Sequence, residues 1–128
     1  MAYYFNKMLN VTFDEAVIKV MEGLKKEGFG ILTDIDVQAT LKKKLDVDFR
    51  KYRILGACNP PFAFQALQAE DKIGTMLPCN VIVQEIAGVG VEVAAVDPVE
   101  SMQAIDNPRL KNIAEEVRAK LKNVIESL

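Results

Sequence analysis

Two valine-rich segments late in the chain constrain the fold most strongly. Residues 79–87 and 89–96 show the alternation of β-strands, and the first segment is apolar on both faces at its start. Gly88 and Gly90, on either side of Val89, indicate a hairpin between the two segments. A strand that is apolar on both sides is buried on both sides, by helices or by a partner chain. The two segments therefore predict the closing strands of a sheet.

Helical patterns flank the predicted strands. Thr12 predicts a helix N-cap, the apolar residues after it recur at helical spacing, and Gly28 predicts the left-handed residue that ends the helix. A second long apolar stripe fills residues 110–128, after Asn107 as the expected cap. Shorter helices are expected at residues 37–45 and 62–70 and from Asp97, and further strands at residues 2–9, 30–36 and 50–58.

The order of these elements predicts an α+β fold. They follow one another as β-α-β-α-β-α-β-β-α, with a turn at Asp71-Lys72. This order favours a largely antiparallel sheet with helices covering one face. No low-complexity segment or linker interrupts the 128 residues, so we expect a single domain over residues 1–128.

Composition excludes several classes of protein. Sixteen basic and eighteen acidic residues argue against a nucleic-acid-binding protein, which needs a basic surface. No apolar run is long enough to suggest a membrane span, and residues 1–7 lack the pattern of a signal peptide. Two cysteines without an export signal are typical of reduced thiols, so we expect a cytoplasmic protein. Histidine is absent, which removes the commonest general base and metal ligand.

The charges are unevenly distributed along the chain. Residues 40–69 carry six basic and two acidic side chains, whereas residues 70–106 carry one basic and seven acidic side chains. One interpretation is that opposite segments help two copies of the chain to pair head to tail. The other, which we favour, is that these charges belong to solvated faces of helices and strands.

Two cysteines are the candidate catalytic residues. Cys58 ends a predicted strand before a helix whose N-terminus favours a thiolate, although Pro60 and Pro61 remove two of the N–H groups that would stabilise one. Cys79 is the sole intrachain choice of resolving thiol in an exchange reaction. Without histidine, papain-type catalysis is excluded. The opposing interpretation is that both cysteines are small buried thiols without reactivity.

No metal site or cofactor is predicted. A zinc site here would need carboxylates beside the two cysteines, or four cysteines from a dimer, and the 21-residue separation of Cys58 and Cys79 matches no compact ligand spacing. Gly88-Val89-Gly90 is not a dinucleotide fingerprint, because a hairpin surrounds it and the third glycine is missing. The sequence thus indicates no particular cofactor.

Acidic and amide side chains supply the candidate ligand-binding residues. Asp34 and Asp36 share one face of a predicted strand, where paired carboxylates bind a cation or share a proton. The structural interpretation pairs them with Arg53 or lets one of them cap the following helix. Asn59 and Asn80 directly follow the cysteines, and each amide offers both donors and an acceptor. Asn59 is also expected to cap the helix after it.

Two cysteine-containing elements carry a family resemblance. The Cys-Asn-Pro element lies in RILGACNP at residues 53–60, and the Leu-Pro-Cys-Asn element lies in IGTMLPCNVIV at residues 73–83. With these elements, nearly the whole chain resembles the bacterial and archaeal family labelled domain of unknown function 302. The resemblance implies a compact α+β fold similar to the TATA-binding-protein-like class, and a homodimer. It implies no established activity, and no nucleic-acid function is carried over from that fold class.

Three functional hypotheses follow. The first is a small cytoplasmic homodimer that binds a small molecule near Cys58, Asn59, Cys79 and Asn80, in a pocket with amide groups and a soft thiol wall. The second is a thiol-dependent redox or sulfur-transfer enzyme, with Cys58 as nucleophile and Cys79 as resolving thiol. The third is a structural or partner-binding module in which the cysteines are core residues.

Overall fold

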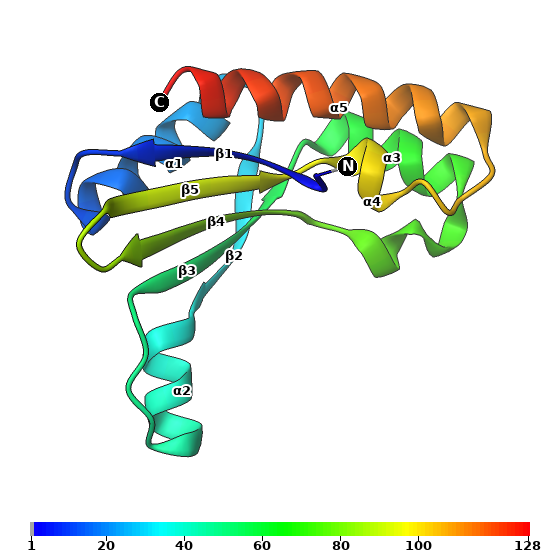
Figure 1. Cartoon of the computed structure of the whole chain (residues 1–128). Helices are drawn as coiled ribbons and strands as arrows, with labels where there is room; N and C mark the ends of the chain where they lie inside the picture. Colours follow the sequence, from blue (N-terminus) through cyan, green and yellow to red (C-terminus); the bar gives the residue numbers. More distant parts are fainter. Residues whose placement is uncertain (1) are drawn as a thin grey trace.

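We describe a computed structural model that covers residues 2–128 of the chain. Its centre is one five-stranded antiparallel sheet with the strand order β1-β5-β4-β3-β2 (Figure 1). The strands are β1 (Tyr4–Leu9), β2 (Gly30–Asp36), β3 (Tyr52–Cys58), β4 (Cys79–Ile86) and β5 (Gly90–Val96). The predicted antiparallel sheet, including the hairpin between its last two strands, is confirmed.

Helices cover one face of this sheet, as the sequence predicts. The helices are α1 (Phe13–Lys26), α2 (Val37–Leu45), α3 (Pro60–Ala69), the 3₁₀ helix η1 (Asp71–Met76), α4 (Pro98–Ser101) and α5 (Pro108–Glu126). Helices α1 and α5 pack against the sheet on the same side, and α5 runs along its length (Figure 1). None of the helices within residues 2–128 has the length and hydrophobicity that crossing a membrane requires.

The predicted helix caps form where the sequence places them, with one exception described below. Thr12 Oγ1 accepts a hydrogen bond from the Glu15 amide, and Asn107 caps α5 in the same way. Gly28 has a φ of 88° after α1, a conformation that glycine adopts without a Cβ penalty. The segment after α3 differs from expectation, because residues 71–76 form the 3₁₀ helix η1 rather than a simple turn at Asp71-Lys72.

The buried hydrophobic residues divide into two clusters. The larger joins the covered face of the sheet to α1 and to the C-terminal half of α5, with Leu24, Leu55 and Leu121 fully buried. The smaller joins α3, η1 and the start of α5 around Ile73, and consists of Ala66, Ile73, Met102, Leu110 and Ala114. Helix α5 therefore belongs to both clusters and connects them.

The other face of the sheet is not covered by any helix. We call it the open face; Tyr4, Met8, Tyr52, Ile82, Ala94 and Val96 lie on it, and none of them is buried. The sequence predicts burial on both sides of β4, yet within one chain only the side facing α1 and α5 is buried. The predicted burial of the second side is therefore not met by the helices of this chain.

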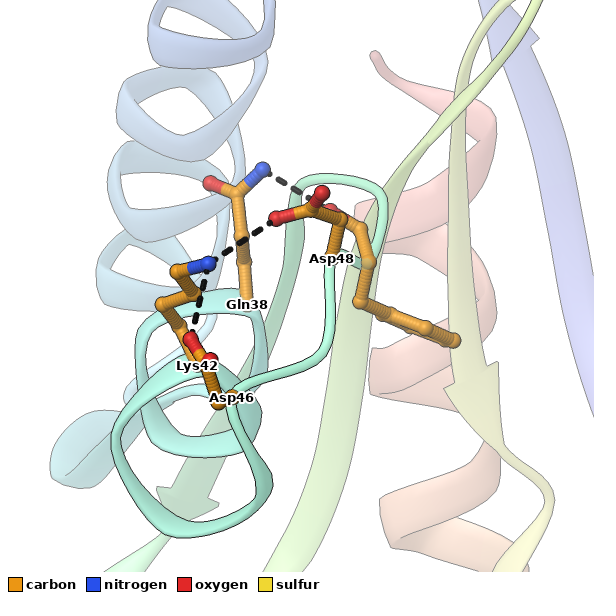
Figure 2. Close-up of polar contacts among 5 residues, drawn as sticks. Gln38, Lys42, Asp46 and Asp48 are labelled. Carbon is orange, nitrogen blue, oxygen red and sulfur yellow. Dashed lines mark hydrogen bonds and ion pairs between the residues drawn. The ribbon is translucent and has the colours of Figure 1, made fainter.

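Helix α2 projects beyond the sheet on the connection between β2 and β3 (Figure 1). None of its residues is buried, and its main contacts are with β2 and β3. Figure 2 shows how polar groups close the loop after it: Gln38 Nε2 donates to the Phe49 carbonyl at 2.9 Å, while Lys42 Nζ lies 3.0 Å from Asp46 and 3.4 Å from Asp48. These exposed ion pairs hold the loop shape and contribute little to global stability.

Candidate functional site

A cavity of about 360 Å³ lies where the two hydrophobic clusters meet. The end of β3 with Cys58 and Asn59, the start of β4 with Cys79, and facing residues of α3 and α5 form its walls. Its volume lies within the range of small-molecule pockets. Three of the four residues expected around a ligand, Cys58, Asn59 and Cys79, therefore border one cavity.

The walls of this junction cavity are almost entirely apolar. No charged side chain lines it, and Asn59 is the only amide among its wall residues. Phe62 and Ala63 of α3 face Ala114 and Val117 of α5 across it. Because burying an unpaired charge is costly, such a space suits an uncharged occupant.

The two cysteines reach the cavity from neighbouring strands. Cys79 pairs with Ala57 across β3 and β4, so Cys58 lies one residue beyond that pair. Cys79 is 8% exposed, and burial, with a smaller contribution from the neighbouring Cys58, raises the pKa of its thiol to about 11. Cys58 is only partly buried. At neutral pH Cys79 is thus a protonated thiol, a poor nucleophile and a slow resolving partner.

Asn59 departs from its expected role as a helix cap. Its side chain makes no capping hydrogen bond to α3, although the residue occupies the N-cap position. Instead, Asn59 Nδ2 donates to the carbonyl oxygen of Glu27 at 3.2 Å. The last carbonyls of a helix have no partner within it, and this bond satisfies one at the end of α1. Asn59 therefore uses its side chain to bond the Glu27 carbonyl of a distant helix rather than to cap its own helix.

Asp34, Asp36 and Arg53 lie away from the cavity. Two of the three guanidinium nitrogens of Arg53 donate to the carboxylate of Asp34: Nε to Oδ1 at 2.7 Å, and Nη2 to Oδ2. This bidentate bond holds the pKa of Asp34 below its usual range. Asp36 Oδ1 caps α2 through the Ala39 amide at 2.9 Å. Arg53 is five residues from Cys58 along β3, roughly 16 Å, so these residues and the cysteines do not form one site.

Asn80 lies on the open face, where a broad groove of about 580 Å³ crosses the sheet. A chain of hydrogen bonds spans the strands beside this groove. Arg50 Nε donates to Gln84 Oε1 at 2.8 Å, Gln84 Nε2 donates to Glu92 at 2.7 Å, and Asn6 Nδ2 donates to Glu92 at 2.9 Å. The two asparagines of the Cys-Asn pairs therefore face different spaces, Asn59 the cavity and Asn80 the groove.

Of the residues that separate the cavity from the groove, Met102 was not predicted from the sequence. Pro78, Cys79 and Met102 border both the cavity and the groove, so they form the wall between them. Met102 follows a four-residue helix and belongs to no periodic pattern. Asp97, expected only as a cap, also accepts a hydrogen bond from Arg118 Nε at 3.1 Å and is 3% exposed. Residues 2–128 contain no cluster of three cysteine or acidic side chains suited to a metal ion.

Comparison with known proteins gives the family of the chain. The family model described as domain of unknown function DUF302 matches residues 5–128. The chain belongs to the DUF302 family. The crystal structure of an uncharacterized conserved DUF302 protein from Bacillus stearothermophilus is similar, with a TM-score of 0.91 and 27% sequence identity over 98% of each chain. No curated protein matches this DUF302 chain. The resemblance carried by the two Cys-Asn elements is therefore confirmed.

Proposed function

We propose that this DUF302 protein binds a small molecule in the junction cavity. The observation that carries the proposal is the position of Cys58, Asn59 and Cys79 on the wall of a single apolar space of about 360 Å³. Pockets of this kind, apolar with few polar groups, are the usual form of ligand sites. An apolar cavity of this size also leaves its lining without packing partners, and a ligand would restore those contacts.

The test is native mass spectrometry of the freshly purified protein, repeated after denaturation. We expect extra mass that leaves on denaturation, or uptake of a neutral aromatic probe such as 2-methoxynaphthalene. Ala63→Phe places a ring in the cavity and should weaken binding at least tenfold. Ala119→Phe, on an exposed position of α5, is the matched control and should leave binding unchanged. Equal binding by wild type and Ala63→Phe, or no retained mass and no probe uptake, contradicts the proposal.

The alternative of a thiol-dependent redox or sulfur-transfer enzyme has less support. Its resolving thiol would be Cys79, whose burial and raised pKa keep it protonated at neutral pH. An exchange reaction needs a thiolate to attack, so this step would be slow. A purely structural role for the cysteines agrees with the burial of Cys79 but does not account for the cavity.

We further propose that two copies pair through the open face. The open face exposes apolar side chains, with Tyr4 and Met8 40% and 42% exposed, and the hydrogen-bonded polar groups Asn6, Gln84 and Glu92 lie among them. Interfaces between proteins commonly combine apolar and polar groups in this way. Charge supports a second copy as the partner. None of the ion pairs among residues 2–128 joins the basic segment 40–69 to the acidic segment 70–106. Lys42, Arg53 and Asp97 have other partners within the chain, so the remaining charges of the two segments are the ones that a second chain would pair. In a dimer with twofold symmetry, the basic segment of each chain would contact the acidic segment of the other, and the two contacts would be equivalent.

Light scattering at micromolar concentration checks this pairing. The wild-type protein should have the mass of a dimer. Ile82→Glu places a charge in the middle of the open face and should give a monomer, whereas Val89→Glu, at the exposed hairpin tip, should remain dimeric. A wild-type monomer, or a dimer that persists in Ile82→Glu, overturns the proposed interface.

A further inference from the structure

The side-chain amide of Asn59 has a fixed orientation. Its partner, the carbonyl oxygen of Glu27, can only accept a hydrogen bond. The group that faces Glu27 must therefore be the NH₂ group, and the amide oxygen must be turned away from it. Oδ1 is an acceptor only, so whatever approaches it must be a donor.

This oxygen is free to accept a hydrogen bond. Within residues 2–128, Oδ1 receives no capping bond from α3, and no hydrogen bond from another side chain reaches it. Asn59 is nevertheless only 8% exposed. Since no fully buried side-chain oxygen or nitrogen in this part of the chain lacks a partner, Oδ1 must reach accessible space. The cavity, of which Asn59 forms a wall, supplies that space.

The remaining walls limit the rest of the ligand. Without a charged residue to pair with, a carboxylate, phosphate or ammonium group would lose its hydration with no compensation. At about 30 Å³ for each water-sized group, the cavity holds roughly a dozen non-hydrogen atoms. Aromatic and aliphatic surfaces from Phe62, Val117 and Leu110 would contact an apolar body of that size.

We infer that the ligand is an uncharged, largely apolar molecule of about this size that carries a hydroxyl or N–H group, and that this group donates a hydrogen bond to Asn59 Oδ1. The inference rests on the proposed function and specifies its ligand class. It also assigns distinct tasks to the two ends of one amide. Nδ2 fixes the side chain to α1, and Oδ1 selects the ligand.

Matched naphthalene derivatives test the ligand class. 2-Naphthol is uncharged at pH 7 and has a donor, 2-methoxynaphthalene keeps the oxygen but lacks the donor, and 2-naphthoate is charged. Because the chain has no tryptophan and only three tyrosines, fluorescence of the naphthalene ring can be followed over a weak protein background. We expect 2-naphthol to bind about tenfold more tightly than 2-methoxynaphthalene, the factor expected of one net hydrogen bond. 2-Naphthoate should bind more weakly than either.

Two asparagine variants test whether Asn59 causes the preference for 2-naphthol. Asn59→Ala should reduce the preference for 2-naphthol from tenfold to about one, whereas Asn80→Ala, which alters the other Cys-Asn pair, should retain it. The ratio of the affinities of one variant for the two probes does not change when the variant loses affinity for both equally. If Asn59→Ala does not fold, equal binding of the two probes to the wild type still overturns the inference.

The outcomes separate the inference from the proposed function. Equal binding of 2-naphthol and 2-methoxynaphthalene to the wild type, abolished by Ala63→Phe, overturns the inference and leaves the cavity as a ligand site. A preference that survives Asn59→Ala also overturns it. Binding of neither probe contradicts the proposed function itself.

Discussion

Gly56→Ala is expected to lower the free energy of unfolding by about 2 kcal/mol, the usual cost of adding a methyl group to a filled site. A Cβ at this position would lie 2.7 Å from Pro78 Cγ and would also clash with Thr33 Oγ1. Thr33 is exposed and can change rotamer, but the proline ring is held by the chain on either side. The strands would have to move apart beside the wall that separates cavity and groove.

Chemical denaturation of three variants measures this effect. Gly30→Ala, on the neighbouring strand β2, is the matched control, because a Cβ there meets nothing within 4 Å. It should be neutral or stabilising by about 0.5 kcal/mol, through a less flexible unfolded chain. Adding Thr33→Ala to Gly56→Ala should restore only part of the loss. Equal stability of Gly56→Ala and Gly30→Ala would show that Pro78 does not lie against β3 in this way.

Wild-type protein is expected to lose about 2 kcal/mol more stability than Cys79→Ala between pH 8 and pH 10.5. Below pH 9, Cys79 is a neutral thiol in both the folded and the unfolded chain. Above pH 9 the unfolded chain ionises at its ordinary value of 9.0, while the folded thiol keeps its proton up to a pKa of about 11. Ionisation thus favours the unfolded state, and stability falls as pH rises through this window.

Urea denaturation at the two pH values, under reducing conditions, gives the comparison. All other ionisable groups are common to both proteins, so their contributions cancel in the difference. Cys58→Ala is the control: it removes the smaller cause of the shift and keeps the larger, so most of the pH effect should remain. A pH dependence identical in wild type and Cys79→Ala would mean that the Cys79 thiol is open to water.

The sequence predicted the fold well because its signals are local. Thr12, Gly28 and Asp36 mark the ends of helices through their own backbone and side-chain preferences, and the structure places the helix ends there. The valine-rich hairpin likewise follows from alternation along a short segment. Strands β2 to β4 each pair with the strand that follows in sequence, whereas the pairing of β1 with β5 joins distant segments and no local pattern predicts it.

The site was harder to predict because it depends on residues distant in sequence. Asn59 has the pattern of a helix cap, but its partner is a carbonyl 32 residues away, and no local pattern reports that need. Pairing of Asp34 with Arg53, one of the structural alternatives for the two aspartates, does form, because β2 and β3 are neighbours in the sheet. The cavity itself lies between α3 and α5. A hydrophobic stripe predicts that a helix packs against another element, but it does not show whether the packed side chains fill the space between them. The sequence around Met102 likewise gives no sign that this side chain separates the cavity from the groove.

The division of the core has a consequence for motion. The smaller cluster contains five buried residues, and four of them, Ala66, Met102, Leu110 and Ala114, also line the cavity. Separation of α3 and η1 from α5 would break these contacts while the sheet, α1 and the rest of α5 remain packed. Local opening of this kind costs less free energy than global unfolding. Leu32 and Leu67 on the cavity wall are exposed, so the space already opens to solvent, and separation of this weaker unit would widen it for a larger ligand.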